Sequence, residues 1–182
     1  MLSDNEHDGN DALLAALVEI ESFVSRSGWD QPARLFGLVP TAELIAAEPS
    51  LAEQLTITVP DALSSVEQED FHPGTDLLTA LNHIVWPWSV PGCALVTERS
   101  FLPPRFESEI PTFPDKAADF VAHHPERVDV RVVAGCLRLA DGTTTIHSVA
   151  RLRSEPSDLL VGAEMVPTLT HVLSQTLATA SY

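Results

Sequence analysis

Basic residues are scarce in this sequence. Lysine and arginine together number 10 against 26 aspartates and glutamates, which gives a formal net charge of −16, and Lys116 is the only lysine. Nucleic-acid binding depends largely on basic side chains that neutralise phosphates, and anionic membranes likewise attract basic segments. An acidic domain repels both. We therefore expect neither nucleic acid nor a membrane among the partners of this protein.

Cysteines and long apolar runs are few or missing. Cys93 and Cys136 are the only two cysteines; both lie in strand-like apolar runs, and no metal-binding spacing includes them. No apolar run approaches the ~18 residues of a membrane-spanning helix, and the first residues are acidic where a secretion signal is basic. The sequence predicts a cytoplasmic protein with no disulfide framework, metal or cofactor.

The usual enzyme motifs are missing as well. Eight glycines are scattered singly, so they form neither a phosphate-binding loop nor a dinucleotide fingerprint, and no serine lies in Gly-x-Ser-x-Gly. His123 and His124 are adjacent, whereas two metal ligands on one helix face need a spacing of three or four. No local pattern amounts to a catalytic signature.

The chain does contain enough apolar sequence for one core, since 45% of its 182 residues are hydrophobic. We expect a single domain over residues 1–182, with residues 1–10 flexible. The apolar run in Gly92 to Phe101 predicts a buried central strand, bounded by prolines. The Trp86-Pro87-Trp88 corner leads into it, and its tryptophans suit either a partner-binding anchor or the end of the core.

Other segments predict helices and short strands around this strand. The order predicts an α+β fold with an antiparallel or mixed sheet of about four to five strands covered by helices, ending in a β-hairpin plus helix. The expected elements are a helix from Asn10 or Asp11 to Gly28, a strand over 33–39, a helix capped by Thr41, an edge strand over 55–59, a solvated acidic run over 61–73, a helix from Thr75 or Asp76 to Pro87, a proline-rich loop over 102–114, a helix from Pro114 to His123 and a helix from Pro167.

Asp141-Gly142 lies between two β-rich runs and predicts a hairpin over 128–153 with a two-residue turn, pairing Ala140 with Thr143. Residues 127–153 hold five arginines against two acids, whereas residues 1–82 hold two arginines against fifteen acids. Outward-facing arginines can receive carboxylates from this chain's own acidic half or from another protein. In the predicted register Val133, Leu137, Leu139, Ile146, Ala150 and Leu152 face the helices, and Cys136, Arg138, His147, Arg151 and Arg153 face outward.

Three sequence blocks resemble a family of actinobacterial proteins of unknown function. They are residues 35–44, residues 86–103 with Trp-Pro-Trp at their start, and the span from Leu152-Arg153 to Val166-Pro167, so that the resemblance extends over nearly the whole chain. The family carries no activity to transfer. More loosely, the order of elements and the acidity are similar to those of type III secretion chaperones, which implies a chaperone-like protein-binding domain.

Two hypotheses follow. The first is a non-enzymatic, adaptor-like or chaperone-like domain that binds another protein or itself. The second is a small enzyme with a site between helices and sheet, in which Cys136 and His147 would be cross-strand neighbours and Glu98 a further suspect. For the first hypothesis, the candidate partner surface is Arg138, Arg151, Arg153, His147, Trp86 and Trp88.

Overall fold

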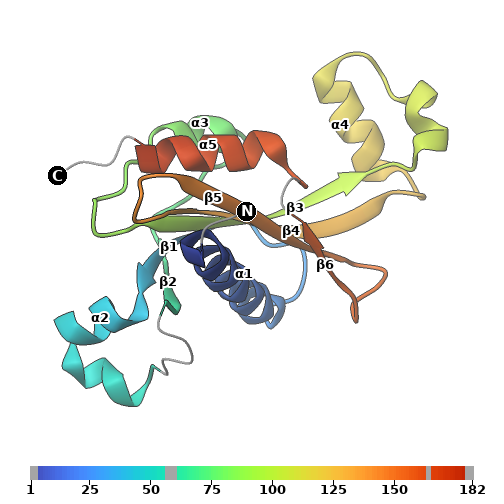
Figure 1. The fold of residues 1–182 in the computed structure, drawn as a ribbon. Coiled ribbons are helices and arrows are strands. Elements are labelled where there is room, and N and C mark those ends of the chain that lie inside the picture. Colours follow the sequence, from blue (N-terminus) through green and yellow to red (C-terminus); the bar gives the residue numbers. More distant parts are fainter. Residues whose placement is uncertain (1–3, 56–60, 163–164, 179–182) are drawn as a thin grey trace.

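The computed structural model describes residues 4–55, 61–162 and 165–178. Within them, six strands form one sheet in the order β2-β1-β3-β4-β5-β6, and helices lie over both faces (Figure 1). The strands are β1 (Arg34–Pro40), β2 (Leu63–Glu67), β3 (Gly92–Phe101), β4 (Val128–Arg138), β5 (Thr144–Leu152) and β6 (Leu159–Gly162). The helices are α1 (Asp4–Ser25), α2 (Thr41–Ala47), α3 (Leu77–Asn82), α4 (Pro114–His123) and α5 (Pro167–Ala178), with the 3-10 helices η1 (Pro49–Glu53) and η2 (Pro104–Glu109).

The predicted α+β class is confirmed, and every strand pair is antiparallel. The sheet has six strands, not the four to five predicted. Strand β2 lies inside the acidic run expected to be solvated, and β6 carried no strand signal. Both are short edge strands, whose pairing depends on a neighbour more than on their own residues. The edge strand expected over 55–59 lies almost wholly outside the described residues.

Local signals placed the starts of most helices. Thr41 is the first residue of α2 and not its expected cap, and α3 ends at Asn82, ahead of the expected Pro87. Strand β3 and helix α4 have the predicted bounds, and α5 begins at Pro167. Asp76 caps α3 by accepting the Thr79 N–H at 3.0 Å. Helix α1 begins at Asp4, ahead of the cap expected at Asn10 or Asp11, and Gly9 in this extension lies against Leu139 after β4.

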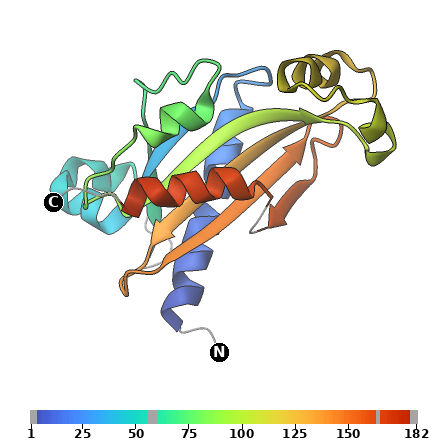
Figure 2. The ribbon, with the colours of Figure 1, turned by 90° about the horizontal axis from the view of Figure 1, so that it is seen from above.

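Helix α1 packs on one face of the sheet and α5 with α3 on the other (Figure 2). Burying each large aliphatic side chain contributes about 1.5–3 kcal/mol. Close packing of α1 depends on Gly135, where an added Cβ would lie 2.6 Å from Leu17 Cδ2. The α1 side includes Leu13, Leu17, Ile20, Val24, Phe36, Leu38 and Val133, and the α5 side includes Leu35, Leu95, Cys93, Cys136, Leu169, Leu173 and Leu177.

The predicted hairpin is present, but its register is shifted by one residue. Leu139 donates its N–H to Thr143 O at 2.7 Å, and Gly142 donates to Leu139 O at 2.9 Å, so that the loop has three residues. Gly142 has a φ of 86°, the left-handed conformation that closes a three-residue hairpin loop. The expected pairing of Ala140 with Thr143 is therefore wrong.

This shift changes the faces, because side chains alternate with a period of two. Cys136 pairs with Ile146, whereas His147 lies opposite Gly135 and Arg151 opposite Arg131. The predicted outward face is thus split between the two sides of the sheet. Cys136 and Arg138 lie on the α5 side, whereas His147 and Arg151 lie on the α1 side. The residues expected to face the helices are also divided. Val133 and Leu137 pack toward α1, and the others pack toward α5 and the residues before it, namely Ile146, Ala150 and Leu152.

Candidate functional site

Arg151 points under α1, where it joins a buried charge network. Its guanidinium donates from Nε to Glu21 Oε1 at 2.7 Å and from Nη2 to Oε2 at 3.0 Å. Arg131, 1% exposed, lies 3.7 Å from the same carboxylate, donates to Gly28 O and stacks over the Trp29 ring at 4.3 Å. The hydrogen bond to Glu21 raises the pKa of Arg151. Of the two sources of carboxylate expected for this arginine, the chain's own is the one found.

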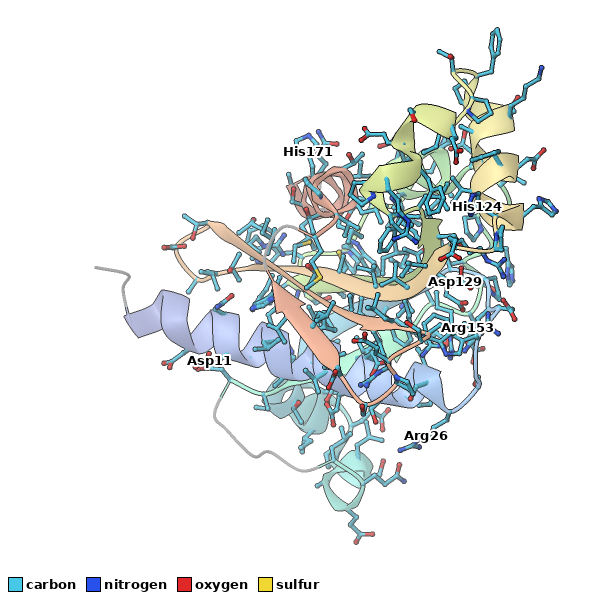
Figure 3. All side chains as sticks on the ribbon, turned by 90° about the vertical axis from the view of Figure 1, so that its right-hand side faces the viewer. Asp11, Arg26, His124, Asp129, Arg153 and His171 are labelled. Atoms are coloured by element: carbon cyan, nitrogen blue, oxygen red, sulfur yellow. The ribbon has the colours of Figure 1, made fainter. Side chains whose placement is uncertain are left out.

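Arg153 is also engaged within the chain. Its Nη1 lies 3.2 Å from Asp30 Oδ1 and 3.7 Å from Asp129 Oδ2, with 43% of the side chain exposed. Figure 3 shows Arg153 and Asp129 side by side at one end of the molecule. Arg153 follows β5 and pairs with Asp129 near the start of β4. It therefore lies at the opposite end of the hairpin from Arg138, and the two do not form one surface.

His147 and Cys136 lie on opposite faces of the sheet, so the expected cross-strand neighbours are not brought together. His147 is 9% exposed and its Nδ1 accepts the Ser148 N–H at 3.0 Å. Cys136 lies against Cys93, with the two Sγ atoms 3.5 Å apart. The hydrogen bond to Cys93 and burial raise the pKa of the Cys136 thiol well above its ordinary value, which disfavours the nucleophilic thiolate.

Glu98, the third enzymatic suspect, holds the turn after α1. Its two carboxylate oxygens accept the backbone N–H groups of Asp30 and Gln31, each at 2.8 Å. Among the described residues, no group of three or more His, Cys, Asp or Glu side chains is placed to hold a metal ion. In those same ranges, no helix combines the length and the apolar character needed to cross a membrane.

Of the two tryptophans around Pro87, one lies in the core and the other lies at the surface. Trp86 is buried and donates its Nε1–H to Thr176 Oγ1 at 3.1 Å, and its ring packs against Gly37. Trp88 is 52% exposed, and the Arg138 guanidinium lies over its ring at 4.0 Å. Trp88 and Arg138 are thus the two candidate residues that the fold brings together at the surface.

Arg138 is fixed in place by the backbone. It donates from Nη1 to Leu177 O at 2.9 Å and from Nη2 to Trp88 O at 3.2 Å. Both acceptors are carbonyls at the ends of segments distant in sequence, so the guanidinium joins β4, the end of α5 and the loop before β3. Its position over the Trp88 ring is consequently set by the fold and not by a partner.

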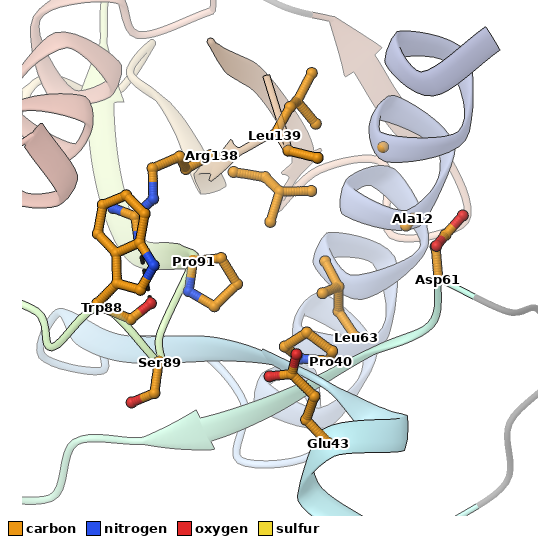
Figure 4. A pocket seen from close by; sticks show the side chains of 13 residues that line it. Ala12, Pro40, Glu43, Asp61, Leu63, Trp88, Ser89, Pro91, Arg138 and Leu139 are labelled. Atoms are coloured by element: carbon orange, nitrogen blue, oxygen red, sulfur yellow. Dashed lines mark hydrogen bonds between the residues drawn. The ribbon is translucent and has the colours of Figure 1, made fainter. Parts of the chain in front are cut away.

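Trp88 and Arg138 form one wall of a cavity of about 540 Å³, which we call the Trp88 pocket (Figure 4). Two exposed carboxylates, Glu43 at the start of α2 and Asp61 before β2, lie on its other side. Neither carboxylate has an ion pair or hydrogen bond among the described residues. The whole lining is Gly9, Ala12, Pro40, Glu43, Asp61, Leu63, Trp88, Ser89, Pro91, Leu137, Arg138, Leu139 and Ala140.

A second hollow of about 820 Å³, which we call the α1–β2 groove, lies between α1 and β2 and shares Ala12 and Leu63 with the Trp88 pocket. The pocket and the groove are therefore contiguous. Sequence reasoning missed Glu43, Asp61 and the groove, because isolated acids and a small-residue helix face carry no local signal. The groove is lined by Ala12, Ala15, Ala16, Glu19, Ser22, Phe23, Arg26, Phe36, Thr41, Gln54, Leu55, Ala62, Leu63, Ser64, Ser65 and Glu67.

Comparison with known proteins gives one finding. A family model described as PPA1309-like protein matches residues 13–178, so the chain belongs to this family. The match spans the sheet, α5 and the part of α1 from Leu13 onward, and it confirms the resemblance to a family of unknown function. No curated protein and no solved structure matches the chain.

Proposed function

We propose that this member of the PPA1309-like family is a cytoplasmic, non-enzymatic protein-binding domain of the adaptor or chaperone-like kind, and that it holds its partner at the Trp88 pocket. The observation that carries the proposal is a half-exposed tryptophan kept in one orientation by an internally anchored arginine. Tryptophan is enriched among the residues that dominate binding energy.

Pre-organisation supports this role. Because Arg138 is held by two carbonyls and stacks on Trp88, a partner does not have to order the indole on arrival. A side chain fixed before binding lowers the entropic cost of association. The apolar lining from Leu63, Pro91 and Leu139 offers burial to one large apolar side chain next to the indole.

Charge defines the partner further. The carboxylates of Glu43 and Asp61 face the pocket and form no ion pair within the described part of the chain, and the whole protein carries −16. A partner segment with lysines or arginines around an apolar residue matches both features. Such complementarity raises the association rate and rejects acidic competitors.

The test is a selection from a phage-displayed library of random peptides of about 12 residues, a length that can form one strand with flanks. We expect enrichment of peptides in which basic residues surround one large apolar residue. Fluorescence anisotropy with the enriched peptides should show that Trp88→Ala weakens binding by about thirtyfold, as for a hot-spot residue. The double variant Glu43→Lys, Asp61→Lys should also weaken peptide binding, and the loss should be larger at low salt than at high salt.

Leu160→Ala is the matched control, since Leu160 is another exposed apolar residue, 46% accessible, on the far edge strand β6. It should bind the peptides as tightly as the wild-type protein. Selection of no peptides, or of peptides that bind Trp88→Ala and the wild-type protein equally well, would overturn the proposal.

A further inference from the structure

Strand β2 has one free edge, and its hydrogen-bonding groups can be assigned by register. At the two ends of the β1–β2 ladder, Thr41 donates its N–H to Ala62 O and Gln68 donates to Leu35 O, each at 2.8 Å. Both pairs continue the observed register of β1 and β2. Hydrogen bonds in an antiparallel ladder involve every second residue. The backbone N–H and C=O groups of Ser64 and Val66 therefore point to β1, and the backbone groups of Leu63, Ser65 and Glu67 point away from it.

No strand in the described ranges lies beyond β2 to receive these outward groups. Natural edge strands are usually blocked by proline, by a bulge or by charge. Strand β2 reads Leu-Ser-Ser-Val-Glu and has neither proline nor bulge. Its one charge, on Glu67, is held back toward β1 by two hydrogen bonds of 3.1 Å from Arg34 Nε. Within the described part of the chain, the edge is thus open to another strand.

The α1–β2 groove lies beside this edge on the α1 side of the sheet. Leu63, Ser65 and Glu67 pair with residues of β1 that face α1, so alternate side chains of a strand added to β2 would enter the groove. There they would meet apolar Phe23 and Phe36, the exposed carboxylate of Glu19 and the exposed guanidinium of Arg26. Because the groove shares Ala12 and Leu63 with the Trp88 pocket, one segment can occupy both.

We propose that a basic, extended segment of a partner protein adds to β2 as a seventh strand, with alternate side chains in the α1–β2 groove and one apolar anchor in the Trp88 pocket. This inference rests on the proposed function and specifies how the partner is held. Main-chain hydrogen bonds supply affinity in strand addition, and the alternate side chains supply specificity.

Charge complementarity selects the occupant. Three carboxylates that have no ion pair among the described residues line the two hollows, those of Glu19, Glu43 and Asp61. They outnumber the two guanidiniums there, which belong to Arg26 and to the carbonyl-bound Arg138. A second copy of this chain would bring another −16 to the same place, which opposes edge-to-edge pairing between copies. A lysine- or arginine-bearing segment from another protein removes this repulsion.

The decisive probe is an N-methyl scan of one peptide selected on the wild-type protein. Strand addition requires hydrogen bonds from every second peptide N–H, so methylation should weaken binding by about three- to tenfold at alternate positions and leave the positions between them unchanged. A peptide held by its side chains alone, or bound as a helix, gives no such alternation. That result would overturn strand addition.

Ser65→Pro tests the same edge from the protein side. Ser65 points its N–H away from β1, so proline there removes an outward donor without breaking the β1–β2 ladder. We expect Ser65→Pro to weaken peptide binding by about tenfold or more and the matched Ser65→Ala to bind as the wild type does. If Ser65→Pro fails to fold, the N-methyl scan on the wild-type protein still decides.

The two proposals fail separately. Peptides that require Trp88 but show no alternation and tolerate Ser65→Pro leave the Trp88 pocket as a binding site and remove strand addition. Peptides that show alternation and require the β2 edge but tolerate Trp88→Ala remove the pocket and keep the edge.

Discussion

Arg151 on β5 holds Glu21 on α1 with two parallel hydrogen bonds, at 2.7 Å and 3.0 Å, beneath the helix, where the Glu21 side chain is buried. A one-residue difference in the hairpin register decides this contact, since the alternative register would have turned Arg151 to the opposite face. Glu21 also lies beside the buried Arg131. One carboxylate therefore compensates two guanidiniums in the core between helix and sheet.

Glu21→Gln should consequently destabilise the protein strongly. The change removes the carboxylate that Arg131, 1% exposed, and the partly buried Arg151 share, and breaking a buried pair from one side costs about 3–5 kcal/mol. Urea unfolding should show this loss. The exposed Glu19 on the same helix provides the control, and Glu19→Gln should unfold like the wild type. A loss below about 1 kcal/mol for Glu21→Gln, within the range of exposed ion pairs, would contradict the structure.

Gly135→Ala should also destabilise, because its Cβ would lie 2.6 Å from Leu17 Cδ2 and 3.2 Å from the Cys93 carbonyl. Overpacking of this kind costs about 1–3 kcal/mol. A double-mutant cycle with Leu17→Ala isolates the clash. Truncating Leu17 should make Gly135→Ala less costly than it is in the wild-type background. Simple additivity of the two losses would show that α1 does not lie against Gly135.

The hairpin loop offers a test of the left-handed conformation of Gly142. Gly142 has a φ of 86° and open space around it, so that an added Cβ meets backbone strain and no neighbour. Gly142→Ala should cost about 1 kcal/mol, and Gly142→Asn should cost less because asparagine tolerates the left-handed region. Thermal unfolding of both variants measures the difference. Equal stability of Gly142→Ala and the wild-type protein would count against this left-handed conformation.

Stability should fall at alkaline pH because of Cys136. The hydrogen bond with Cys93 and burial raise the pKa of this thiol in the folded protein, whereas the unfolded thiol ionises at about pH 8.5. Above that pH the unfolded state binds fewer protons, so the free energy of unfolding declines as pH rises toward the folded pKa, by at most about 1.4 kcal/mol per pH unit for one group. Urea unfolding at about pH 7 and about pH 9.5 measures the decline.

Cys136→Ala separates this thiol from the other groups that titrate in the same range. Its stability should depend less on pH between those two conditions than that of the wild-type protein. Identical pH dependence in the two proteins would show that the Cys136 thiol ionises in the folded state as it does in the unfolded one.

The candidate site was only partly visible in the sequence. Trp86 and Trp88 are separated by one residue, and nothing local distinguishes them. Trp86 is buried because Gly37 leaves room for its ring and Thr176 accepts its N–H, while Trp88 meets Arg138 at the surface. Those partners come from segments far apart in the chain.

The sequence alone determined the features that depend on a few neighbouring residues. The apolar run in β3, the prolines that begin α4 and α5, the Asp76 cap and the Asp141-Gly142 reversal act over a few residues, and each appears where it was predicted. Together they determined the α+β class and the order of most elements.

Only the tertiary structure decided the sheet edges, the hairpin register and the pocket. Strands β2 and β6 form because a neighbouring strand offers hydrogen bonds. The hairpin register is set by a three-residue loop, although the local sequence also suits a two-residue loop. Since side chains alternate between the faces of a sheet, that one residue moved His147 and Arg151 under α1 and left Arg138 beside Trp88. Long-range pairing, which no local pattern encodes, thus chose which of the candidate residues reach the surface together.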